Sequence, residues 1–559
     1  MYRRIFIADR GLSARYVAMR VRALGAVPVV AVSTAEREQG WLSEFESVCI
    51  GPRAAEHSYL NGLALLQGAL ESRCTALHPG LSPLGDHPVF AALVAARGLA
   101  FLGPSAGALE RMAPAKVRYV TEACGIASAP RTALRTWFDD GPVPSLRWPV
   151  TVEMTLPLAR SLSLGGRLPA EVEHHHSLYP GLRQRVQVTS EVALRQLARR
   201  AYRLGALDAS WLAESDAGVE VGCIVAGDAF GAHAALPLGF VYADEALDLC
   251  SIGPCASLHP EGEVAREIAE RTARVLGVQG LCLVRCVLTT GDPSSMDRAS
   301  VRLEGSGPSW FDAGASPAHG GWHEAESTHG ALKGRVALRS VSGLSDPAVL
   351  GLHMLAGIDL VALGISLARG VRLEEALYGG KDTHHARATL AERALARGTM
   401  ALITHPPGRE TQVRGPRRCV LPNRENSALD GSCAHGEGSA HRVSVQSLAY
   451  LSEAEPTREA NALEESYDGR LMVVTVADKE SAQASSRALA GILSEVVVAN
   501  LSTNLEALRL RVQRRVQAHA IGAPAIVEGE PPLVGEARTD EESRHDLCPS
   551  QRPSAGSVE

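Results

Sequence analysis

The sequence predicts a multidomain protein of α/β and α+β class whose N-terminal domain is a doubly wound parallel sheet. Its 559 residues exceed what one hydrophobic core organises, so three or four domains are expected. Within the first 110 residues, short β-branched runs alternate with segments whose apolar residues recur at helical spacing. Residues 383–480 consist mostly of strand-like runs separated by long polar loops. The alternation favours a parallel sheet with helices on both faces, and the later runs favour a mixed, β-rich C-terminal domain.

The N-terminal elements follow from local patterns. The segment 11–26, for example, has apolar residues at helical spacing and ends at a glycine. The predicted strands are 4–8, 27–33, 47–52, 74–80 and 99–104, and the predicted helices are 11–26, 59–73 and 88–98. This order is that of a nucleotide-binding fold, although the GxGxxG fingerprint of dinucleotide-binding proteins is missing.

The rest of the chain is less regular. A helical linker region containing Lys116 follows Gly103, and residues 147–230 read as a small mixed unit with strands near 149–154 and 219–225. The later predicted elements are a helix at 261–277, a hairpin strand at 280–292, a long helix at 347–370, a helix at 480–494, a short strand and a closing helix that ends near 518. The segment from Ile521 onward is rich in Pro, Gly and Glu, which predicts a disordered tail.

Composition excludes several classes of protein. The net charge of −6 is spread along the chain, so nothing points to nucleic acid. No apolar run approaches 18 residues and no leader precedes the first strand, so a cytoplasmic protein without a membrane span is expected. The eleven cysteines form no CxxC pair, and Cys282 and Cys286 lack a second ligand pair at zinc spacing. They are interpreted as reduced thiols of the core.

An ordered series of motifs resembles the biotin carboxylase family. The N-terminal motifs are IFIADRGLSARYV, VCIGP, SYLN, HPG, FLGPSA and MAPAK, which ends at Lys116. The later ones are GIDLVALGISLARGVRL, YDGRLMVV and VANLSTNLEAL. The resemblance covers roughly residues 2–515, and the order of the series carries it rather than any single match.

The resemblance implies an ATP-grasp enzyme that activates bicarbonate with ATP and Mg²⁺ and carboxylates biotin on a carrier protein. The implied domains are a pre-ATP-grasp domain at 1–115, an ATP-grasp region at 116–335 with its lid near 147–230, a helical continuation at 336–380, a C-terminal domain at 381–518 and the tail at 519–559. The chain contains no Met-Lys-Met-type site for covalent biotin, so the carrier domain is expected on another chain.

Four residues match functional positions of that family. The resemblance implies that Lys116 contacts phosphate and that Glu220 is a retained residue of the ATP site. It further implies that Glu304 is the second metal-binding glutamate and that Arg442 steadies the biotin enolate. Bound polyphosphate requires such cations, together with metal ions held by carboxylates.

Most other positions depart from the family. Glu153 stands in place of the second ATP lysine, and Arg285 in place of the first metal-binding glutamate. The glycine-rich lid loop falls on residues 154–166, whose bulky side chains and Pro157 oppose a phosphate cradle. Further departures are Gly218, Leu249, Ser306 and Pro308. Replacing a cation that faces phosphate with an anion costs several kcal/mol in a partly desolvated site.

Three interpretations remain open. The first is a catalytically degenerate subunit, a pseudoenzyme that is a structural or regulatory partner of a biotin carboxylase paralogue, a biotin carrier protein or other subunits of an acetyl-/acyl-CoA carboxylase, in a homo- or hetero-oligomer. The second is an active ATP-dependent biotin carboxylase with rearranged ligands, using Lys116, Glu220, Glu304 and Arg442. The third is a sensor that binds a small molecule in the former nucleotide cleft.

Overall fold

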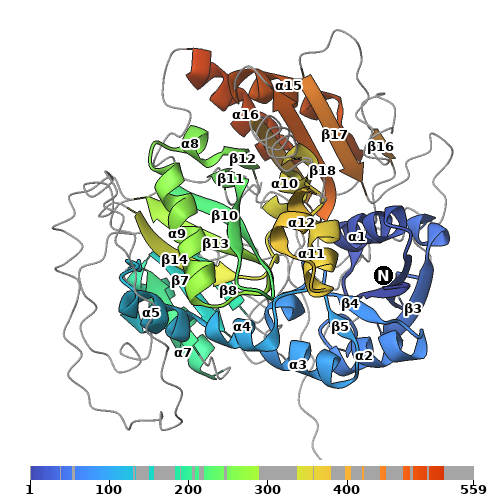
Figure 1. Ribbon diagram of the computed structural model, residues 1–559. Coiled ribbons are helices and arrows are strands. Elements are labelled where there is room, and N and C mark those ends of the chain that lie inside the picture. Colours follow the sequence, from blue (N-terminus) through green and yellow to red (C-terminus); the bar gives the residue numbers. More distant parts are fainter. Residues whose placement is uncertain are drawn as a thin grey trace, which may run out of the picture.

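The computed structural model places the secondary structure in four sheets with helices packed around them (Figure 1). The residues it describes are 2–34, 36–37, 40–52, 57–129, 132–133, 150–155, 183–188, 190–203, 208–212, 219–244, 249–288, 336–356, 358–378, 397–404, 418–420, 441–447, 470–478, 482–499 and 503–520. The tail predicted at 519–559 lies almost entirely outside these ranges, because they end at residue 520.

The N-terminal unit is a five-stranded parallel sheet with strand order β3-β2-β1-β4-β5. Its strands are β1 (Arg4–Ile7), β2 (Val27–Ser33), β3 (Glu46–Gly51), β4 (Ala76–His78) and β5 (Ala100–Phe101). Its helices are α1 (Gly11–Ala23), α2 (Gly62–Glu71) and α3 (Pro88–Ala96), with 3-10 turns at Gly40–Glu44 and Pro83–Asp86. The crossovers explain the parallel order, because parallel strands need a long connection.

The two faces of this sheet belong to separate hydrophobic clusters. Ile5 and Ile7 of β1 pack with Val17 of α1 on one face. Phe6, which points to the other face, packs with Leu65 of α2 and the other buried side chains there. The predicted doubly wound N-terminal unit is therefore confirmed.

The centre of the molecule is an eight-stranded antiparallel sheet with order β14-β13-β10-β11-β12-β15-β18-β17. Its strands are β10 (Val219–Gly227), β11 (His233–Asp244), β12 (Leu249–Pro254), β13 (Gly280–Leu288), β14 (Val336–Ser342), β15 (Arg397–Thr404), β17 (His441–Ser447) and β18 (Arg470–Asp478). The sheet thus combines strands from both sides of residue 381, the predicted start of the C-terminal domain.

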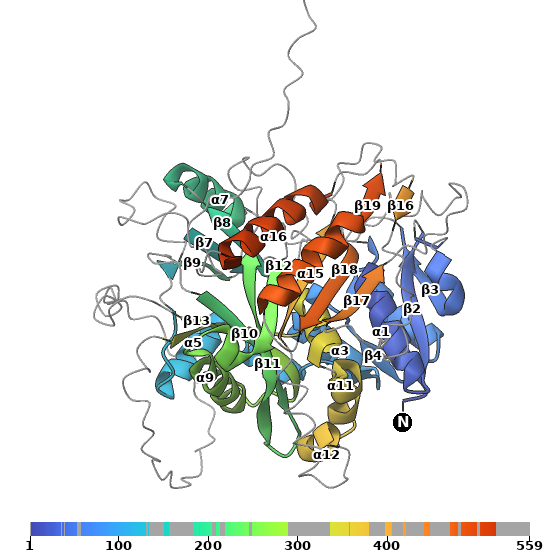
Figure 2. The same ribbon diagram turned by 90° about the horizontal axis from the view of Figure 1, so that it is seen from above.

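Several helices pack against the central sheet (Figures 1 and 2). Helices α8 (Cys255–Leu258) and α9 (Gly262–Val275) pack at the β10–β14 end. Helices α15 (Ala482–Glu495) and α16 (Leu505–Ala520) pack over β15 and β18. Figure 1 shows α11 (Leu360–Ala368) and α12 (Leu373–Tyr378) between the N-terminal unit and the central sheet.

The remaining elements are small. A four-stranded sheet of order β6-β9-β7-β8 contains β6 (Thr132–Ala133), β7 (Val150–Thr155), β8 (Arg183–Val188) and β9 (Asp208–Leu212). Helix α7 (Glu191–Arg203) lies between β8 and β9 in the chain. A two-stranded sheet pairs β16 (Arg418–Val420) with β19 (Val497–Ala499). Helices α4 (Ala106–Arg111) and α5 (Pro114–Ala123) follow the N-terminal unit.

Three predicted elements differ from the structure. The strand expected near 219–225 belongs to the central sheet, where β10 pairs with β11 and β13, rather than to the small unit. The strand expected to form a hairpin at 280–292 is β13, an interior strand. The long helix expected at 347–370 is two helices, α10 (Ala348–Ala356) and α11, because the Asp359 side chain accepts a hydrogen bond from Ala362 N and caps a new helix.

Candidate functional site

Four charged side chains form an ion-pair network at one end of the central sheet. Glu220 lies on β10 and Arg285 on the adjacent β13, while Arg339 lies on β14, the edge strand. Asp346 precedes α10. In the strand register Arg285 pairs with Gly222 and with Ser340, so the network spans three neighbouring strands.

The distances define a chain of alternating charges. Arg285 Nη1 lies 2.9 Å from Glu220 Oε1, and Arg285 Nη2 contacts Asp346 Oδ2. Arg339 Nε lies 3.0 Å from the second oxygen of Glu220. The side chains of Arg285 and Glu220 are 16% and 17% exposed, whereas those of Asp346 and Arg339 are each 4% exposed. Such largely buried pairs are screened much less by salt than surface pairs.

The surroundings fix the network in place. The Tyr242 hydroxyl donates to Asp346 Oδ1 at 2.8 Å, and Ala348 N donates to the same oxygen at 2.7 Å. The Arg285 guanidinium also lies 5.9 Å from the ring centres of Phe240 and Tyr242, within reach of a cation–π interaction. Asp346 therefore joins the start of α10 to the sheet.

The carboxylates of this network are not available as ligands for a pair of Mg²⁺ ions. Mg²⁺ prefers carboxylate oxygens. Both carboxylates here, Glu220 and Asp346, form ion pairs with guanidinium groups, and the two positive charges balance the two negative ones. The β14 sequence VALRSVS contains no carboxylate. No group of three or more His, Cys, Asp or Glu residues able to hold a metal occurs among the residues the structure describes. The described residues of the network therefore do not fit the metal ions that the resemblance implies.

The other predicted site residues lie elsewhere or outside the described ranges. Lys116 is exposed on α5 and is the only lysine among the described residues. Arg442 lies on β17, at the opposite edge of the eight-stranded sheet from the network. Glu153 is in β7, opposite Arg185 and Ser210. Leu249 is buried in β12, and Glu304 lies outside the described residues, as do Gly218, Ser306, Pro308 and the loop beyond Thr155.

Sequence reasoning brought Glu220 and Arg285 into one site, but it missed Arg339 and Asp346. The Asp346-Pro347 pair before an apolar helix is a recognisable helix-start signal, which could have located Asp346 near the end of β14. Arg339 gives no such signal, because one arginine within a short strand-like run reads as a solvent-facing residue.

A second buried polar cluster lies at the carboxyl ends of β1 and β2. Arg10 Nη2 is 3.2 Å from Glu36 Oε1, and these side chains are only 2% and 3% exposed. The hydroxyl of Ser33 donates to Glu36 Oε2 at 3.0 Å, and Tyr59 also donates to that oxygen. The Tyr59 ring lies 4.6 Å from the Arg10 guanidinium. Ligands of open α/β sheets bind at this edge, but here the protein's own side chains fill it.

The described cysteines are free thiols. Cys282 and Cys286 are buried in β13, and burial raises the pKa of Cys282 to about 12. Cys223 Sγ lies 3.7 Å from Cys255 Sγ, and their contact, together with burial, raises the pKa of Cys223. Thiols held in their neutral form are poor nucleophiles and poor metal ligands.

His78, the last residue of β4, predicts a pH dependence of stability. Burial lowers its pKa to about 4, partly opposed by Asp359, and its Nδ1 accepts a hydrogen bond from Gly80 N at 2.9 Å. Between pH 6.5 and 4 the unfolded chain binds a proton that the folded chain rejects, so stability falls as pH is lowered through this window. Urea unfolding should show a loss of up to about 2 kcal/mol from pH 7 to pH 5 through this residue.

The matched variant is His78→Asn, which keeps an acceptor for Gly80 N but does not titrate. It should lose less stability than the natural chain over the same pH interval. An identical pH dependence in both chains would show that His78 does not titrate as described.

The comparisons with known proteins agree with this architecture. Residues 1–109 match the family model of the biotin carboxylase N-terminal domain. Biotin carboxylase of Pseudomonas aeruginosa is 34% identical over 146 residues, which are 26% of this chain and 31% of that protein. Methylcrotonoyl-CoA carboxylase subunit alpha of Glycine max is 36% identical over 110 residues, which are 20% of this chain and 15% of that protein. The matched segments thus span about a third or less of these relatives.

Solved structures extend the likeness of the fold to most of the chain. The biotin carboxylase β,γ-ATP complex from Campylobacter jejuni matches with a TM-score of 0.60 and 16% identity, covering 92% of this chain and 95% of that one. A pyruvate carboxylase from Rhizobium etli matches with a TM-score of 0.63 and 15% identity, covering 93% of this chain and 39% of that one. The described fold is therefore the biotin carboxylase fold. The N-terminal part of the chain also matches the biotin carboxylase family in sequence.

Proposed function

We propose that this chain is a biotin carboxylase-like subunit that does not catalyse ATP-dependent carboxylation and is a structural or regulatory partner in an acetyl-/acyl-CoA carboxylase assembly. The observation that carries the proposal is the Glu220–Arg285–Asp346–Arg339 network. It includes Arg285, the position on β13 to which the resemblance assigns the first metal-binding glutamate.

Electrostatics supports the loss of metal binding. Two unit charges 4 Å apart interact by about 4 kcal/mol at an effective dielectric of 20, so a divalent cation at that distance from one guanidinium is repelled by about 8 kcal/mol. Glu220 and Asp346 are paired with Arg285 and Arg339, so the four side chains carry no net negative charge that would offset this repulsion and attract the metal. Without the metal, the phosphates of ATP lose the charge compensation that phosphoryl transfer requires.

The retained scaffold supports a role in assembly. A solved relative from Hydrogenobacter thermophilus is a biotin carboxylase domain dimer with bound MgADP and bicarbonate, and its fold covers 92% of this chain. The partner proposed here is a motif-complete biotin carboxylase paralogue, a biotin carrier protein or another carboxylase subunit. The proposed compartment is the cytoplasm; no described helix is long and apolar enough to cross a bilayer.

Two measurements on the full chain test the proposal. Isothermal titration with ATP and Mg²⁺ at millimolar concentration should detect no binding, whereas a motif-complete biotin carboxylase titrated in parallel should bind. Affinity purification of the tagged chain from its own cell should recover a carboxylase subunit. The same tag on an unrelated chain should recover none.

Each result has a contrary outcome. Hydrolysis of ATP that depends on bicarbonate and biotin would establish the alternative, an active carboxylase with rearranged ligands drawn from Lys116, Glu220, Glu304 and Arg442. Recovery of no carboxylase subunit would refute the role as an assembly partner.

A further inference from the structure

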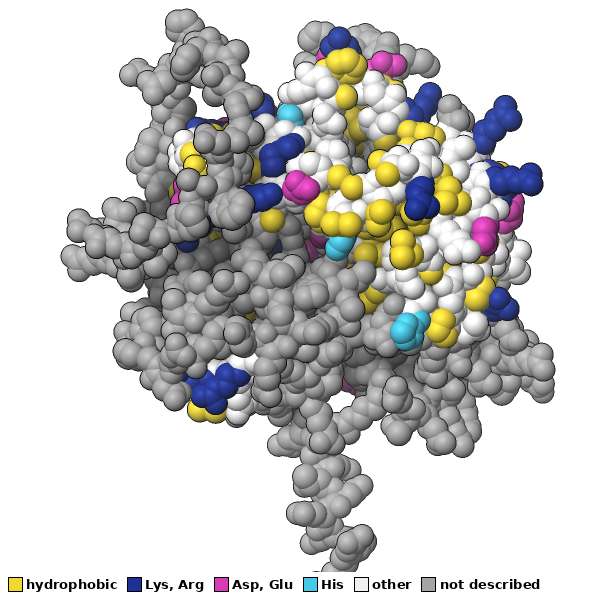
Figure 3. All heavy atoms as spheres, turned by 90° about the horizontal axis from the view of Figure 1, so that it is seen from below, with side chains coloured by type: hydrophobic (Ala, Val, Ile, Leu, Met, Phe, Trp, Pro, Cys, Tyr) yellow, Lys and Arg dark blue, Asp and Glu magenta, His cyan; other side chains and the backbone are white. Residues whose placement is uncertain are grey.

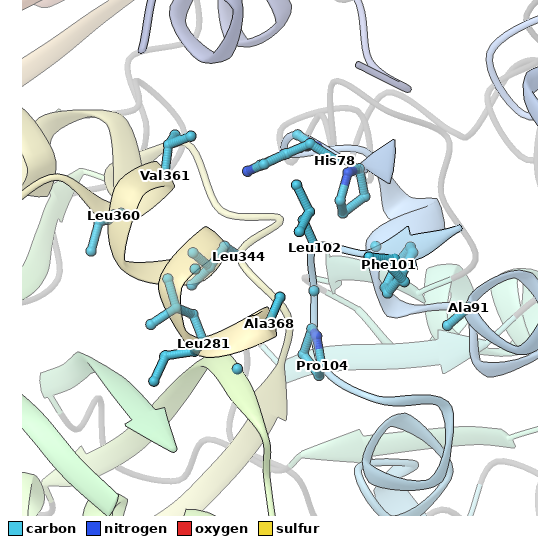
Figure 4. Close-up of a pocket in the computed structure, with 18 of the residues that line it drawn as sticks. His78, Ala91, Phe101, Leu102, Pro104, Leu281, Leu344, Leu360, Val361 and Ala368 are labelled. Atoms are coloured by element: carbon cyan, nitrogen blue, oxygen red, sulfur yellow. The ribbon is translucent and has the colours of Figure 1, made fainter. Parts of the chain in front are cut away.

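An apolar cavity of about 370 Å³ lies between the N-terminal unit and α11. One wall consists of the loop after β4 and the segment from β5 to α4, including Leu102 and Pro104. The other consists of α11, with Val361 and Gly364, and the first residues of β13. Figure 4 shows Leu360, Val361 and Ala368 on one side of this space and His78, Leu102 and Pro104 on the other.

The cavity reaches the surface. Ala95, Ala229, Gln279, Ala368 and Gly370 belong to its lining and are exposed, so they mark its mouth. Seen from below, the described surface carries an area where hydrophobic side chains gather with few charges between them (Figure 3). A small molecule can therefore enter without unfolding of either wall.

The described lining has no charge. None of the described residues that line the cavity is Asp, Glu, Lys or Arg, and their polar side chains are those of Tyr16, His78, Ser82, Ser105, Gln279 and Ser345. A phosphate or carboxylate held inside would lack a counter-charge, and burying an unpaired charge is costly. His78 does not supply one, since its imidazole is neutral at physiological pH.

We infer that this cavity is a binding site for a neutral aliphatic molecule of roughly 10 to 15 carbon atoms. Benzene fills a cavity of about 150 Å³, or about 25 Å³ per carbon, so a volume of 370 Å³ takes roughly 15 carbons. The size falls within the usual range of ligand pockets, which are mostly apolar with few polar groups. The inference does not depend on the proposed function, because the cavity shares no residue with the ion-pair network.

The site joins parts of the protein that are distant in sequence. Arg20 of α1 pairs with Asp359 at 2.5 Å, and the Tyr2 hydroxyl donates to Ala368 O at 3.2 Å, so direct contacts already hold α11 against the N-terminal unit. A ligand that fills the space between them binds only when they are docked. It therefore stabilises the native state by RT ln(1 + [L]/Kd), which grows with the logarithm of its concentration above Kd.

The test uses decan-1-ol with the full chain and follows thermal unfolding over a range of alcohol concentrations. The expected result is a rise in Tm that becomes linear in the logarithm of the alcohol concentration above Kd. Hexan-1-ol, which is four methylenes shorter, should bind about 200-fold more weakly at about fourfold per methylene. Decanoate at pH 8 should bind at least about tenfold more weakly than decan-1-ol, because its carboxylate meets no cation.

Variants at Gly364 locate the binding. A Cβ at Gly364 would lie 3.6 Å from Leu281 Cδ1, an ordinary contact, so Gly364→Ala should fold and bind about fourfold more weakly. Gly364→Met extends into the cavity and should abolish the rise in Tm. The matched control is Gly491→Met in α15, another helical glycine, whose Cβ would have nothing within 4 Å; it should respond like the natural chain.

Three outcomes would overturn the inference. They are the lack of a concentration-dependent rise in Tm with decan-1-ol, an undiminished rise in both Gly364 variants, and equally tight binding of decanoate. If Gly364→Met fails to fold, the comparison of Gly364→Ala with the natural chain still decides where the alcohol binds.

Discussion

Replacing Arg285 with methionine should destabilise the central sheet by about 3–5 kcal/mol, the usual cost of removing one partner from a buried ion pair. The change leaves Glu220 and Asp346 without the guanidinium that joins them, and Asp346 is almost inaccessible to water. Hydrogen exchange of amides in β10 and β13 measures the effect directly, because exchange reports the stability of each structural unit separately.

The matched control for this substitution is Arg274→Met. Arg274 pairs with Glu270 at 2.7 Å on α9, but these side chains are 49% and 29% exposed, so the loss should be below about 0.5 kcal/mol. Adding Asp346→Asn to Arg285→Met removes the negative charge that has lost its arginine partner, while keeping an acceptor for Tyr242 and Ala348 N. The double variant should recover part of the stability lost in Arg285→Met. Equal effects of Arg285→Met and Arg274→Met would contradict the account of the network.

The N-terminal unit could be predicted because each of its signals is local. Asn61 illustrates this: its side chain accepts from Leu63 N and Ala64 N at 3.2 Å, which fixes the start of α2 within a few residues of the apolar run. The parallel sheet followed from the alternation of strands and helices, because a helix between two strands provides the crossover that parallel strands need. No sequence signal of comparable strength places β10 beside β13, because the strands β11 and β12 and the helices α8 and α9 lie between them in the chain.

The ion-pair network shows where reasoning from sequence stops. Arg285 was identified as a departure from the family at a position where a carboxylate was expected. Its partner Asp346 comes from the segment before α10, and Arg339 from a strand that starts 48 residues after β13 ends. Compensation between charges distant in sequence depends on strand register, and a one-residue slip would turn Arg285 to the other face of the sheet.

The compensation also bears on function. An arginine substituted into an intact metal site would leave a repulsive, unpaired charge, whereas Arg285 has two carboxylate partners and Glu220 has two arginine partners. A network with balanced charges stabilises the fold without any ligand. This supports a subunit in which the sheet is retained as a scaffold.

The buried Arg10–Glu36 pair should be as sensitive as the central network. Glu36→Gln removes the negative charge opposite Arg10 and weakens the acceptor for Tyr59 and Ser33, so a loss of about 3–5 kcal/mol is expected in the N-terminal unit. Hydrogen exchange in β1 and β2 provides the measurement. The control is Glu46→Gln, whose partner Arg4 lies 2.6 Å away with side chains 30% and 55% exposed, and the expected loss there is below about 1 kcal/mol.

A double variant separates charge from packing in this cluster. Arg10→Met together with Glu36→Leu removes both charges, and replacing a complete buried pair with apolar residues is often neutral or stabilising. The double variant should therefore be more stable than Glu36→Gln alone, even though it changes more atoms. If it is less stable, the cluster is held by its hydrogen bonds to Ser33 and Tyr59 rather than by the ion pair, and the effect of Glu36→Gln has been assigned to the wrong interaction.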